Sequence, residues 1–177
     1  MRRCRPMMTM TNDPVEVHGW KILAHPLLLA QIEALLPKVA AYKAKDPANF
    51  LKKNATRRLL AIKKLMLSAV PINPDAPEYR QGKTLGAEHT AWRRAKFFQQ
   101  YRLFFRFHSE ARIIVFAWVN DEKTKRAYGS ASDAYRVFGR MLHSGQPPSD
   151  WDALLHEAKG ACGEFSALLK RLDGGGQ

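Results

Sequence analysis

The apolar positions of the N-terminal third predict a short strand followed by a helix. Residues 15–24 alternate loosely between apolar and polar side chains, which favours a strand. His25-Pro26 is expected to end it, because the residue before a proline disfavours the helical conformation. Over residues 28–39 apolar side chains return every three or four positions, as in an amphipathic helix, although Pro37 predicts a kink or a break.

A second helix is predicted next. Asp46-Pro47 supplies an N-cap residue followed by a proline suited to the first turn. The apolar stripe of this helix would run from Leu51 to Met66, with most of its lysines and arginines off that stripe. Residues 71–77 contain three prolines and are expected to form a rigid loop.

The middle of the chain changes from a helical to an extended pattern. Residues 92–97 and 101–107 are predicted to be strands, and in the second the apolar and cationic side chains alternate. Residues 108–111 are expected to form a hairpin loop. Residues 112–119 are almost continuously apolar, which is typical of a central strand buried on both faces.

The C-terminal third returns to helical patterns. Asp133 is expected to cap a helix that ends near Gly145, and Ser149 to begin a last helix. Gly160 and Gly163 weaken that last helix. A strand, two helices, an antiparallel group of strands and further helices together predict an α+β fold.

Charge then narrows the classes of function. The 177-residue chain has 29 Lys and Arg against 16 Asp and Glu, a formal net charge of +13. Residues 43–126 alone hold 19 basic and 7 acidic residues, a net +12. No stretch is apolar and long enough for a membrane helix, and no apolar segment follows the basic start as in a secretory signal. We therefore expect a cytoplasmic protein with no membrane partner, for which nucleic acid is the first candidate.

Several kinds of catalytic site are not supported by the sequence. The six histidines have no metal-ligand spacing and the two cysteines lie near opposite ends of the chain, so no metal or cofactor is expected. The Gly-x-Ser-x-Gly motif of many serine hydrolases is absent. Gly82-Lys83-Thr84 lacks the upstream glycine spacing of a phosphate-binding loop.

A cationic strand face remains as the candidate site. Arg94 and Lys96 in one strand are two residues apart, and Arg102 and Arg106 in the next strand are four residues apart. All four therefore share one side of the sheet if the strands pair. Such a face would bind phosphates, with aromatic neighbours for base stacking. It could also cleave RNA without a metal, because RNA carries its own 2′-OH nucleophile and cations stabilise the phosphorane. The alternative is a solvated basic face paired with acidic loop residues.

Particular strings in the sequence add a family resemblance, and they run collinearly from about residue 17 to about residue 158. They are Gly19-Trp20, Ala24-His25-Pro26, Lys45-Asp46-Pro47, Gly82-Lys83-Thr84-Leu85-Gly86, Trp92-x-Arg94-x-Lys96-Phe97, Tyr101-Arg102-Leu103-Phe104-Phe105-Arg106, Ala117-Trp118-Val119-Asn120-Asp121-Glu122, Arg126-x-Tyr128-Gly129, Asp133-Ala134-Tyr135-x-Val137-Phe138 and Pro147-Pro148-x-Asp150-Trp151. With this ordered set the chain resembles the YhaV-type toxins of bacterial type II toxin–antitoxin systems, within the RelE-like superfamily.

The resemblance implies a RelE-like fold, a small antiparallel sheet with two N-terminal helices packed on it and further C-terminal helices. The toxin domain would span residues 15–158, between a disordered extension over 1–14 and a weakly helical to disordered tail over 159–177. The implied function is that of a ribosome-associated, metal-independent mRNA endoribonuclease that inhibits translation and growth. Its partners would be mRNA, the ribosome and a cognate antitoxin, which is expected to bind DNA and to regulate the operon through the complex.

The resemblance also implies roles for individual residues. The catalytic set would be Arg94, Lys96, Arg102, Arg126 and Tyr128, with Arg94 as the first choice for phosphate and transition-state binding and Tyr128 for base stacking or proton transfer. Asn120 and Asp121 would orient these groups. RNA or ribosome binding is expected at Lys52, Lys53, Arg57, Lys63, Lys64, Arg93, Arg106, Lys123 and Lys125. His108 and His143 match no motif of the family, so a histidine general base is not expected.

Two functions of other classes stay open. One is a non-catalytic RNA- or DNA-binding protein with a basic sheet face, and the other is an interaction module whose basic face binds an antitoxin. Removal of Arg94 separates the nuclease from the binder. A nuclease would lose cleavage by orders of magnitude, whereas a binder would lose a single phosphate contact.

Overall fold

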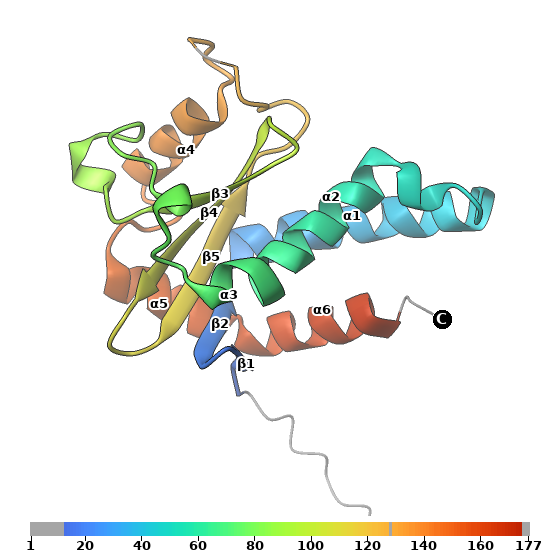
Figure 1. Ribbon diagram of the computed structural model, residues 1–177, viewed down its shortest axis with the longest axis horizontal. Helices are drawn as coiled ribbons and strands as arrows, with labels where there is room; N and C mark the ends of the chain where they lie inside the picture. The colour runs from blue at the N-terminus through green and yellow to red at the C-terminus, as the bar shows by residue number, and fades with distance from the viewer. Residues whose placement is uncertain (1–12, 128, 175–177) are drawn as a thin grey trace, which may run out of the picture.

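A computed structural model describes residues 13–127 and 129–174, which form a five-stranded sheet with helices on both faces (Figure 1). The strands are β1 (Val15–Val17), β2 (Trp20–Ala24), β3 (Arg93–Phe97), β4 (Tyr101–His108) and β5 (Ile113–Val119). Their order is β1-β2-β5-β4-β3, and neighbours are antiparallel except β2 and β5, which are parallel. The predicted α+β class is confirmed, but the sheet is mixed rather than wholly antiparallel.

The first strand of the prediction is in fact a hairpin. The chain turns between β1 and β2 at His18 and Gly19, whose φ angles are 50° and 78°. Two consecutive positive φ angles are typical of a tight hairpin turn, but histidine rarely adopts one. The loose alternation of residues 15–24 therefore concealed the turn. The strands predicted at 92–97, 101–107 and 112–119 correspond to β3, β4 and β5, and all seven residues of β5 are buried.

The N-terminal helices differ from the prediction in their boundaries. The helical segments of this half are α1 (Pro26–Lys45), a 3₁₀ turn (Phe50–Lys52), α2 (Asn54–Lys64), a π-helical turn (Leu65–Ala69), α3 (Val70–Ile72) and two further 3₁₀ turns (Pro77–Tyr79 and Ala87–His89). Helix α1 continues through Pro37, because its buried apolar stripe compensates for the hydrogen bond that proline cannot make. Asp46 ends α1 instead of starting α2: its backbone N–H donates to the Tyr42 carbonyl.

His25 fixes the junction between β2 and α1. Its Nδ1 accepts a hydrogen bond from the backbone N–H of Leu27 at 3.2 Å, which caps the helix. Its Nε2 lies 2.5 Å from Oε2 of Glu157 in α5 (Trp151–Gly160). Both ring nitrogens of this buried histidine are therefore engaged, and the Ala24-His25-Pro26 string has a structural role here.

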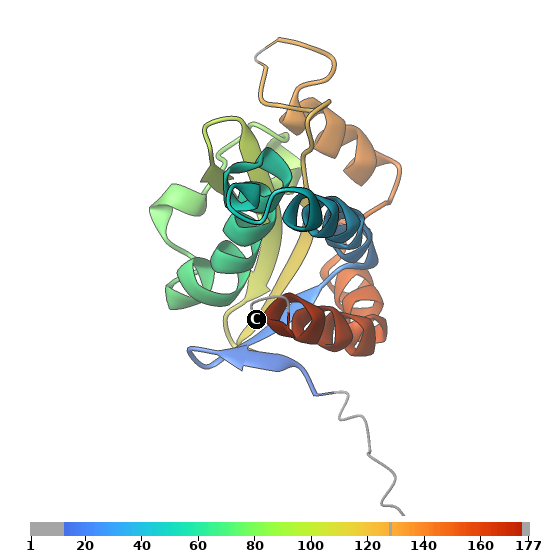
Figure 2. The ribbon, with the colours of Figure 1, turned by 90° about the vertical axis from the view of Figure 1, so that its right-hand side faces the viewer.

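The alternation along the strands divides the apolar residues into two cores, one on each face of the sheet. Figure 2 shows the helices that cover the sheet. On the first face, Phe105 and Phe116 pack with α1, α2 and α6 (Cys162–Gly174). On the second face, Phe104 and Val115 pack with α4 (Ala134–His143) and α5. The cationic positions of β3 and β4 lie on this second face, beside α4.

The C-terminal helices begin where their caps predict, and they extend further than expected. Asp133 is the N-cap of α4, as predicted, and Asp150 rather than Ser149 caps α5. Helix α6 replaces the expected weak tail, since Phe165 and Leu168 are buried in the first core and this burial outweighs the cost of about 1 kcal/mol for a glycine in the helix. The expected extension over 1–14 falls almost entirely outside the described residues. No helix in the described part of the chain is apolar and long enough to cross a membrane.

Candidate functional site

The β3–β4 hairpin brings the predicted cations onto one face. Arg94 is paired with Phe104 and Lys96 with Arg102 in the antiparallel register. Because side chains alternate along a strand, these four residues project from the face that α4 covers. The ring of Phe104 stacks on Phe138 of α4, with centroids 4.1 Å apart. Helix α4 thereby lies directly beside the cations.

Tyr135 of α4 is the centre of this cluster. Its hydroxyl oxygen accepts a hydrogen bond from Nε of Arg94 at 2.7 Å and another from Nε of Arg102 at 3.3 Å. The guanidinium of Arg126 lies over the tyrosine ring, 4.9 Å from its centroid. Three guanidinium groups from β3, β4 and the loop after β5 therefore meet around one side chain. We call Arg94, Arg102, Arg126 and Tyr135 the arginine–tyrosine cluster.

Asp133 holds the cluster in place through contacts to Arg126 and to the backbone at the start of α4. Its carboxylate pairs with the Arg126 guanidinium and accepts hydrogen bonds from the backbone N–H groups of Ala127 at 2.7 Å and Tyr135 at 3.1 Å. Burial acts to raise the pKa of Asp133, but the bonds from Arg126 and Ala127 outweigh it and lower the pKa below its usual value. Asp133 therefore stays ionised and fixes both Arg126 and the start of α4.

The two residues predicted to orient the catalytic groups act on the backbone. Asn120 is fully buried; its Oδ1 accepts from the N–H of Arg102 at 2.6 Å, and its Nδ2 donates to the carbonyls of Gln100 and Thr124, both at 2.8 Å. Asp121 accepts from the N–H groups that follow it and holds the next turn. These bonds join the end of β5 to the β3–β4 turn, where the N–H of Arg126 also donates to Gln100.

The cluster members differ in how far a ligand reaches them. Arg102 is only 7% exposed, and its Nη1 donates to the carbonyls of Gln99 and Tyr101. Arg94 is half-buried, and Lys96 on the same face is exposed. A phosphate would therefore meet Arg94 and Lys96 first, with Arg102 behind them. Tyr128, the predicted stacking or proton-transfer residue, lies outside the described residues.

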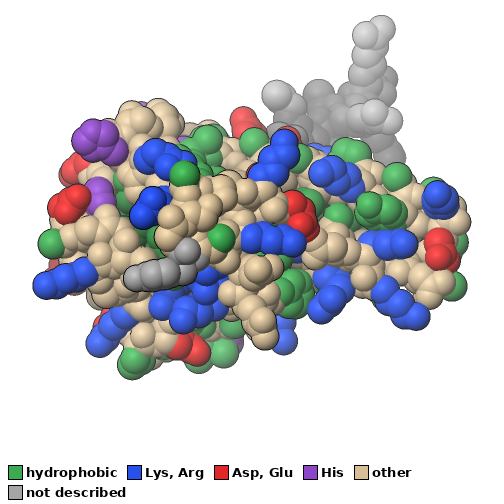
Figure 3. Space-filling model, turned by 90° about the horizontal axis from the view of Figure 1, so that it is seen from above, with side chains coloured by type: hydrophobic (Ala, Val, Ile, Leu, Met, Phe, Trp, Pro, Cys, Tyr) green, Lys and Arg blue, Asp and Glu red, His purple; other side chains and the backbone are tan. Residues whose placement is uncertain are grey.

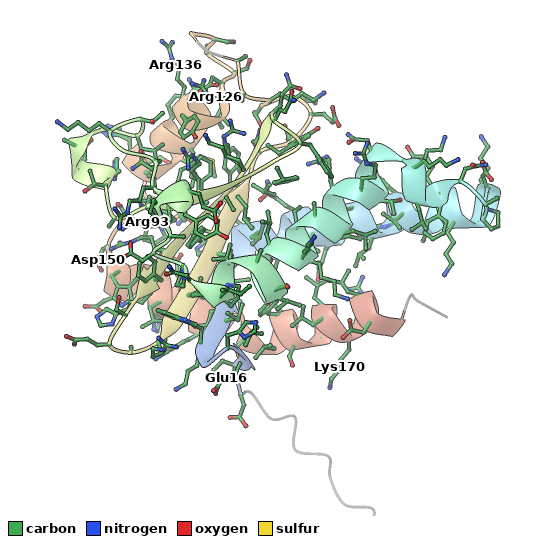
Figure 4. The ribbon with its side chains drawn as sticks, viewed as in Figure 1. Glu16, Arg93, Arg126, Arg136, Asp150 and Lys170 are labelled. Atoms are coloured by element: carbon green, nitrogen blue, oxygen red, sulfur yellow. The ribbon has the colours of Figure 1, made fainter. Side chains whose placement is uncertain are left out.

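The other predicted RNA-binding cations come from different elements of the fold, and Figure 4 labels Arg93 among them. Arg93 projects from the opposite side of β3 and donates to the Thr90 carbonyl and to Asp75. Arg106 lies further along β4, between the rings of Trp92 and Trp151; burial lowers its pKa, although Asp150 opposes this. The remaining members belong to the α2 region or to the loop after β5: Lys52, Lys53, Arg57, Lys63, Lys64, Lys123 and Lys125.

Basic side chains are nevertheless numerous at one end of the molecule. Figure 3 looks onto the end of the molecule that carries Arg126 and shows Lys and Arg side chains distributed across it. Arg57 at the start of α2 stacks on Phe98 in the β3–β4 turn, 4.7 Å from the ring centroid. Tyr101 joins the start of β4 to the loop after β5 through a hydrogen bond from its hydroxyl to Glu122. Burial and this bond raise the pKa of Tyr101 to about 12, so its hydroxyl remains a donor.

Sequence reasoning did not assign Tyr135 and Asp133 to the site. Asp133 was predicted only as a helix cap, and Tyr135 was given no role of its own within the helix that follows. Both belong to the string Asp133-Ala134-Tyr135-x-Val137-Phe138, which carried part of the family resemblance. That string was the available signal, because a cap followed two residues later by a tyrosine places the hydroxyl at the start of the helix.

A group of cations around a tyrosine hydroxyl, with a single carboxylate among them, suits a phosphate ligand. The described residues hold no group of three or more His, Cys, Asp or Glu side chains that could bind a metal ion. Residues 22–159 match the family described as "Toxin with endonuclease activity, of toxin-antitoxin system". The chain thus belongs to a class of toxins with nuclease activity.

This match covers most of the chain, and the chain belongs to the YhaV toxin family. It is 42% identical to Toxin YhaV of Escherichia coli O6:H1 (strain CFT073) and 41% identical to Ribonuclease toxin YhaV of Escherichia coli (strain K12). Each comparison extends over 148 residues, 82% of this chain and 96% of the relative. No solved structure matches the chain. The predicted toxin with nuclease activity is confirmed, and membership of a toxin–antitoxin system implies an antitoxin partner.

Proposed function

We propose that this toxin is an mRNA endoribonuclease and that it cleaves RNA at the arginine–tyrosine cluster. The observation that carries the proposal is the convergence of three guanidinium groups on Tyr135, beside the exposed Lys96. The name of one relative, a ribonuclease toxin, supports RNA as the substrate.

The chemistry proposed for the cluster is attack of a 2′-OH on the adjacent phosphate. The new P–O2′ bond closes a 2′,3′-cyclic phosphate while the P–O5′ bond breaks, a base takes the 2′-OH proton and an acid protonates the leaving 5′-oxygen. The pentacoordinate phosphorane carries more negative charge than the starting diester, so cations fixed in place stabilise it selectively. Arg94 donates through Nε to Tyr135 and through Nη1 to the carbonyl of Glu78. Its Nη2 has no hydrogen-bond partner among the described residues. Arg94 and Lys96 would hold the non-bridging oxygens of the scissile phosphate.

Tyr135, Arg102 and Arg126 would position these groups. The Tyr135 hydroxyl fixes the Nε of Arg94, and the buried Arg102 supports that hydroxyl from the other side. Arg126 lies on the tyrosine ring and is held by Asp133. We retain Tyr128 as the proposed residue for base stacking or proton transfer, since it follows Arg126 closely in the chain.

Finer features of the function are proposals as well. RNA supplies its own nucleophile, so the reaction is proposed to need no metal. Cytoplasmic action on ribosome-bound mRNA is proposed as well, and it is supported by the basic side chains at the end of the molecule that carries Arg126. The antitoxin is proposed to bind DNA and to regulate its own operon together with the toxin.

Substitution of Arg94 tests the proposal. We expect Arg94→Ala to reduce cleavage of an mRNA by about 10²–10³-fold, as loss of one transition-state donor does in other enzymes. Lys170→Ala is the matched control, because Lys170 is an exposed cation on α6, away from the cluster (Figure 4). Purified proteins are compared by mapping RNA ends, and their folding is checked by circular dichroism.

The outcome also separates a nuclease from a binder. A binding protein would show no cleavage in the wild type, and Arg94→Ala would lower the slope of log affinity against log salt by about one phosphate contact. Cleavage of RNA at the wild-type rate by the folded Arg94→Ala protein would refute the assignment of the site. Intact mRNA and normal growth on expression of soluble wild-type protein would refute the nuclease function.

A further inference from the structure

An apolar groove opens on the opposite face of the sheet from the arginine–tyrosine cluster. It has a volume of about 370 Å³ and lies between α1, the 3₁₀ turn at Phe50–Lys52, α2 and the end of α6. Leu36, Phe50 and Leu172 form part of its lining. Leu51 and Leu60 also line it, and they are 56% and 50% exposed. Single exposed leucines are common, but two beside one apolar groove indicate a surface that a partner covers.

Basic residues outnumber acidic ones around this groove. In its lining, Lys63 pairs with Asp173 at 2.6 Å and Arg171 pairs with Glu33 at 3.6 Å. Residues 43–64 include eight Lys and Arg and a single acidic residue. Arg57 and Lys64 lie three residues before and four residues after Leu60, so they flank it on the same side of α2. Lys52 and Lys53 directly follow Leu51 in the chain. The groove therefore combines an apolar floor with a cationic border.

This combination fits an acidic amphipathic helix. Such a helix presents apolar side chains at positions i, i+3 or i+4, and i+7 to a groove, and its acidic flanks would meet the cations. RNA would satisfy the cations but has no aliphatic side chains for the apolar floor. The membership of a toxin–antitoxin system supplies a protein partner that must bind a chain of net charge +13.

We propose that this groove binds an acidic amphipathic helix of the antitoxin. The proposal rests on membership of the toxin–antitoxin family and not on the mechanism of cleavage. The groove residues pack against the first core, whereas Tyr135 belongs to the second. Anchoring of the antitoxin is therefore separate from access to the cluster, and substitutions in the groove release the antitoxin without removing the toxin's activity.

The test uses the full-length toxin and the antitoxin encoded by the neighbouring reading frame. The toxin variant carries Leu51→Asp and Leu60→Asp, and its matched control carries Ile72→Asp, because Ile72 is 70% exposed on α3, outside the groove. We expect the groove variant to bind the antitoxin at least about tenfold more weakly, as for loss of interface anchors. Growth arrest by the variant should persist and escape rescue by co-expressed antitoxin, while the control is rescued normally.

A second pair of substitutions guards against misfolding and simple charge repulsion. Leu51→Ala with Leu60→Ala removes the apolar contacts without adding charge, and should also weaken the antitoxin, by a smaller factor. Unchanged antitoxin affinity in the folded variants overturns the proposal. So does a loss of ribosome binding while the antitoxin affinity stays the same, since the surface would then serve RNA. If the wild type neither arrests growth nor cleaves RNA, the proposed nuclease function fails, and the affinity measurement still decides the groove.

Discussion

Replacement of Tyr135 by phenylalanine tests whether this hydroxyl positions Arg94. The substitution removes one oxygen atom, and with it the acceptor of the hydrogen bonds at 2.7 Å and 3.3 Å from Arg94 and Arg102. Water can replace the hydroxyl beside the half-buried Arg94. It has far less access to Arg102, which is 7% exposed. The lost interaction is therefore mainly that of a buried charged donor.

The expected loss of stability follows from the burial of Arg102. A hydrogen bond to a charged group contributes about 1.5–3 kcal/mol, so we expect the free energy of unfolding to fall by about that amount. For a chain of this size the midpoint of thermal unfolding would fall by about 3–12 °C. Because Arg94 would no longer be fixed at the phosphate, we expect kcat for RNA cleavage to fall by about 10²-fold, as for a displaced catalytic group.

Steady-state cleavage of a short RNA measures this effect, with thermal unfolding followed on the same samples. A residue that positions a transition-state donor lowers kcat and leaves KM nearly unchanged, whereas general destabilisation would not separate the two constants. The matched control is Tyr42→Phe, because Tyr42 lies on α1 and is exposed. Wild-type kcat in the folded Tyr135→Phe protein would refute the positioning role.

Three further substitutions test other parts of the reasoning. Asp133→Asn removes the ion pair to Arg126 and should lower stability by about 1–3 kcal/mol at neutral pH. The pKa of Asp133 is lowered in the folded protein, so its contribution to the free energy of unfolding is present above the unfolded-state pKa and is lost as pH falls through the folded-state pKa. The free energies of unfolding of the wild type and of Asp133→Asn should therefore converge in acid. Asn120→Ala removes the three hydrogen bonds from this buried side chain to the backbone of Arg102, Gln100 and Thr124, and should cost about 2–4 kcal/mol in urea unfolding. Phe165→Ala should cost about 3–5 kcal/mol if α6 belongs to the core, and next to nothing if it is a frayed tail.

The central strands were the most predictable part of the fold. Along β4 the alternation of apolar and cationic residues assigns each side chain to a face, and along β5 an unbroken apolar run requires cover on both sides. These patterns depend only on neighbouring residues and on burial. The pairing of β3 with β4, and hence the shared face of Arg94 and Arg102, followed directly.

Local signals failed where a distant contact decided the outcome. Asp46-Pro47 has the composition of a helix start, but the packing of α1 on the first core continues that helix up to Lys45. The glycines near residue 160 indicate a weak helix, yet α6 is held by Phe165 in the same core. Tyr135 was missed for a similar reason. A tyrosine on an apolar stripe is ordinarily a core residue, and only the fold shows that two arginines reach its hydroxyl.

The parallel pairing of β2 with β5 has a consequence for the order in which the toxin is made. Residues 21–24 must wait for residues 113–116 to leave the ribosome before this part of the sheet can form. Tyr135 emerges later still, after the whole sheet. A nascent chain therefore carries most of its positive charge well before its cluster is complete, and the cluster can form only when translation of that chain is nearly finished.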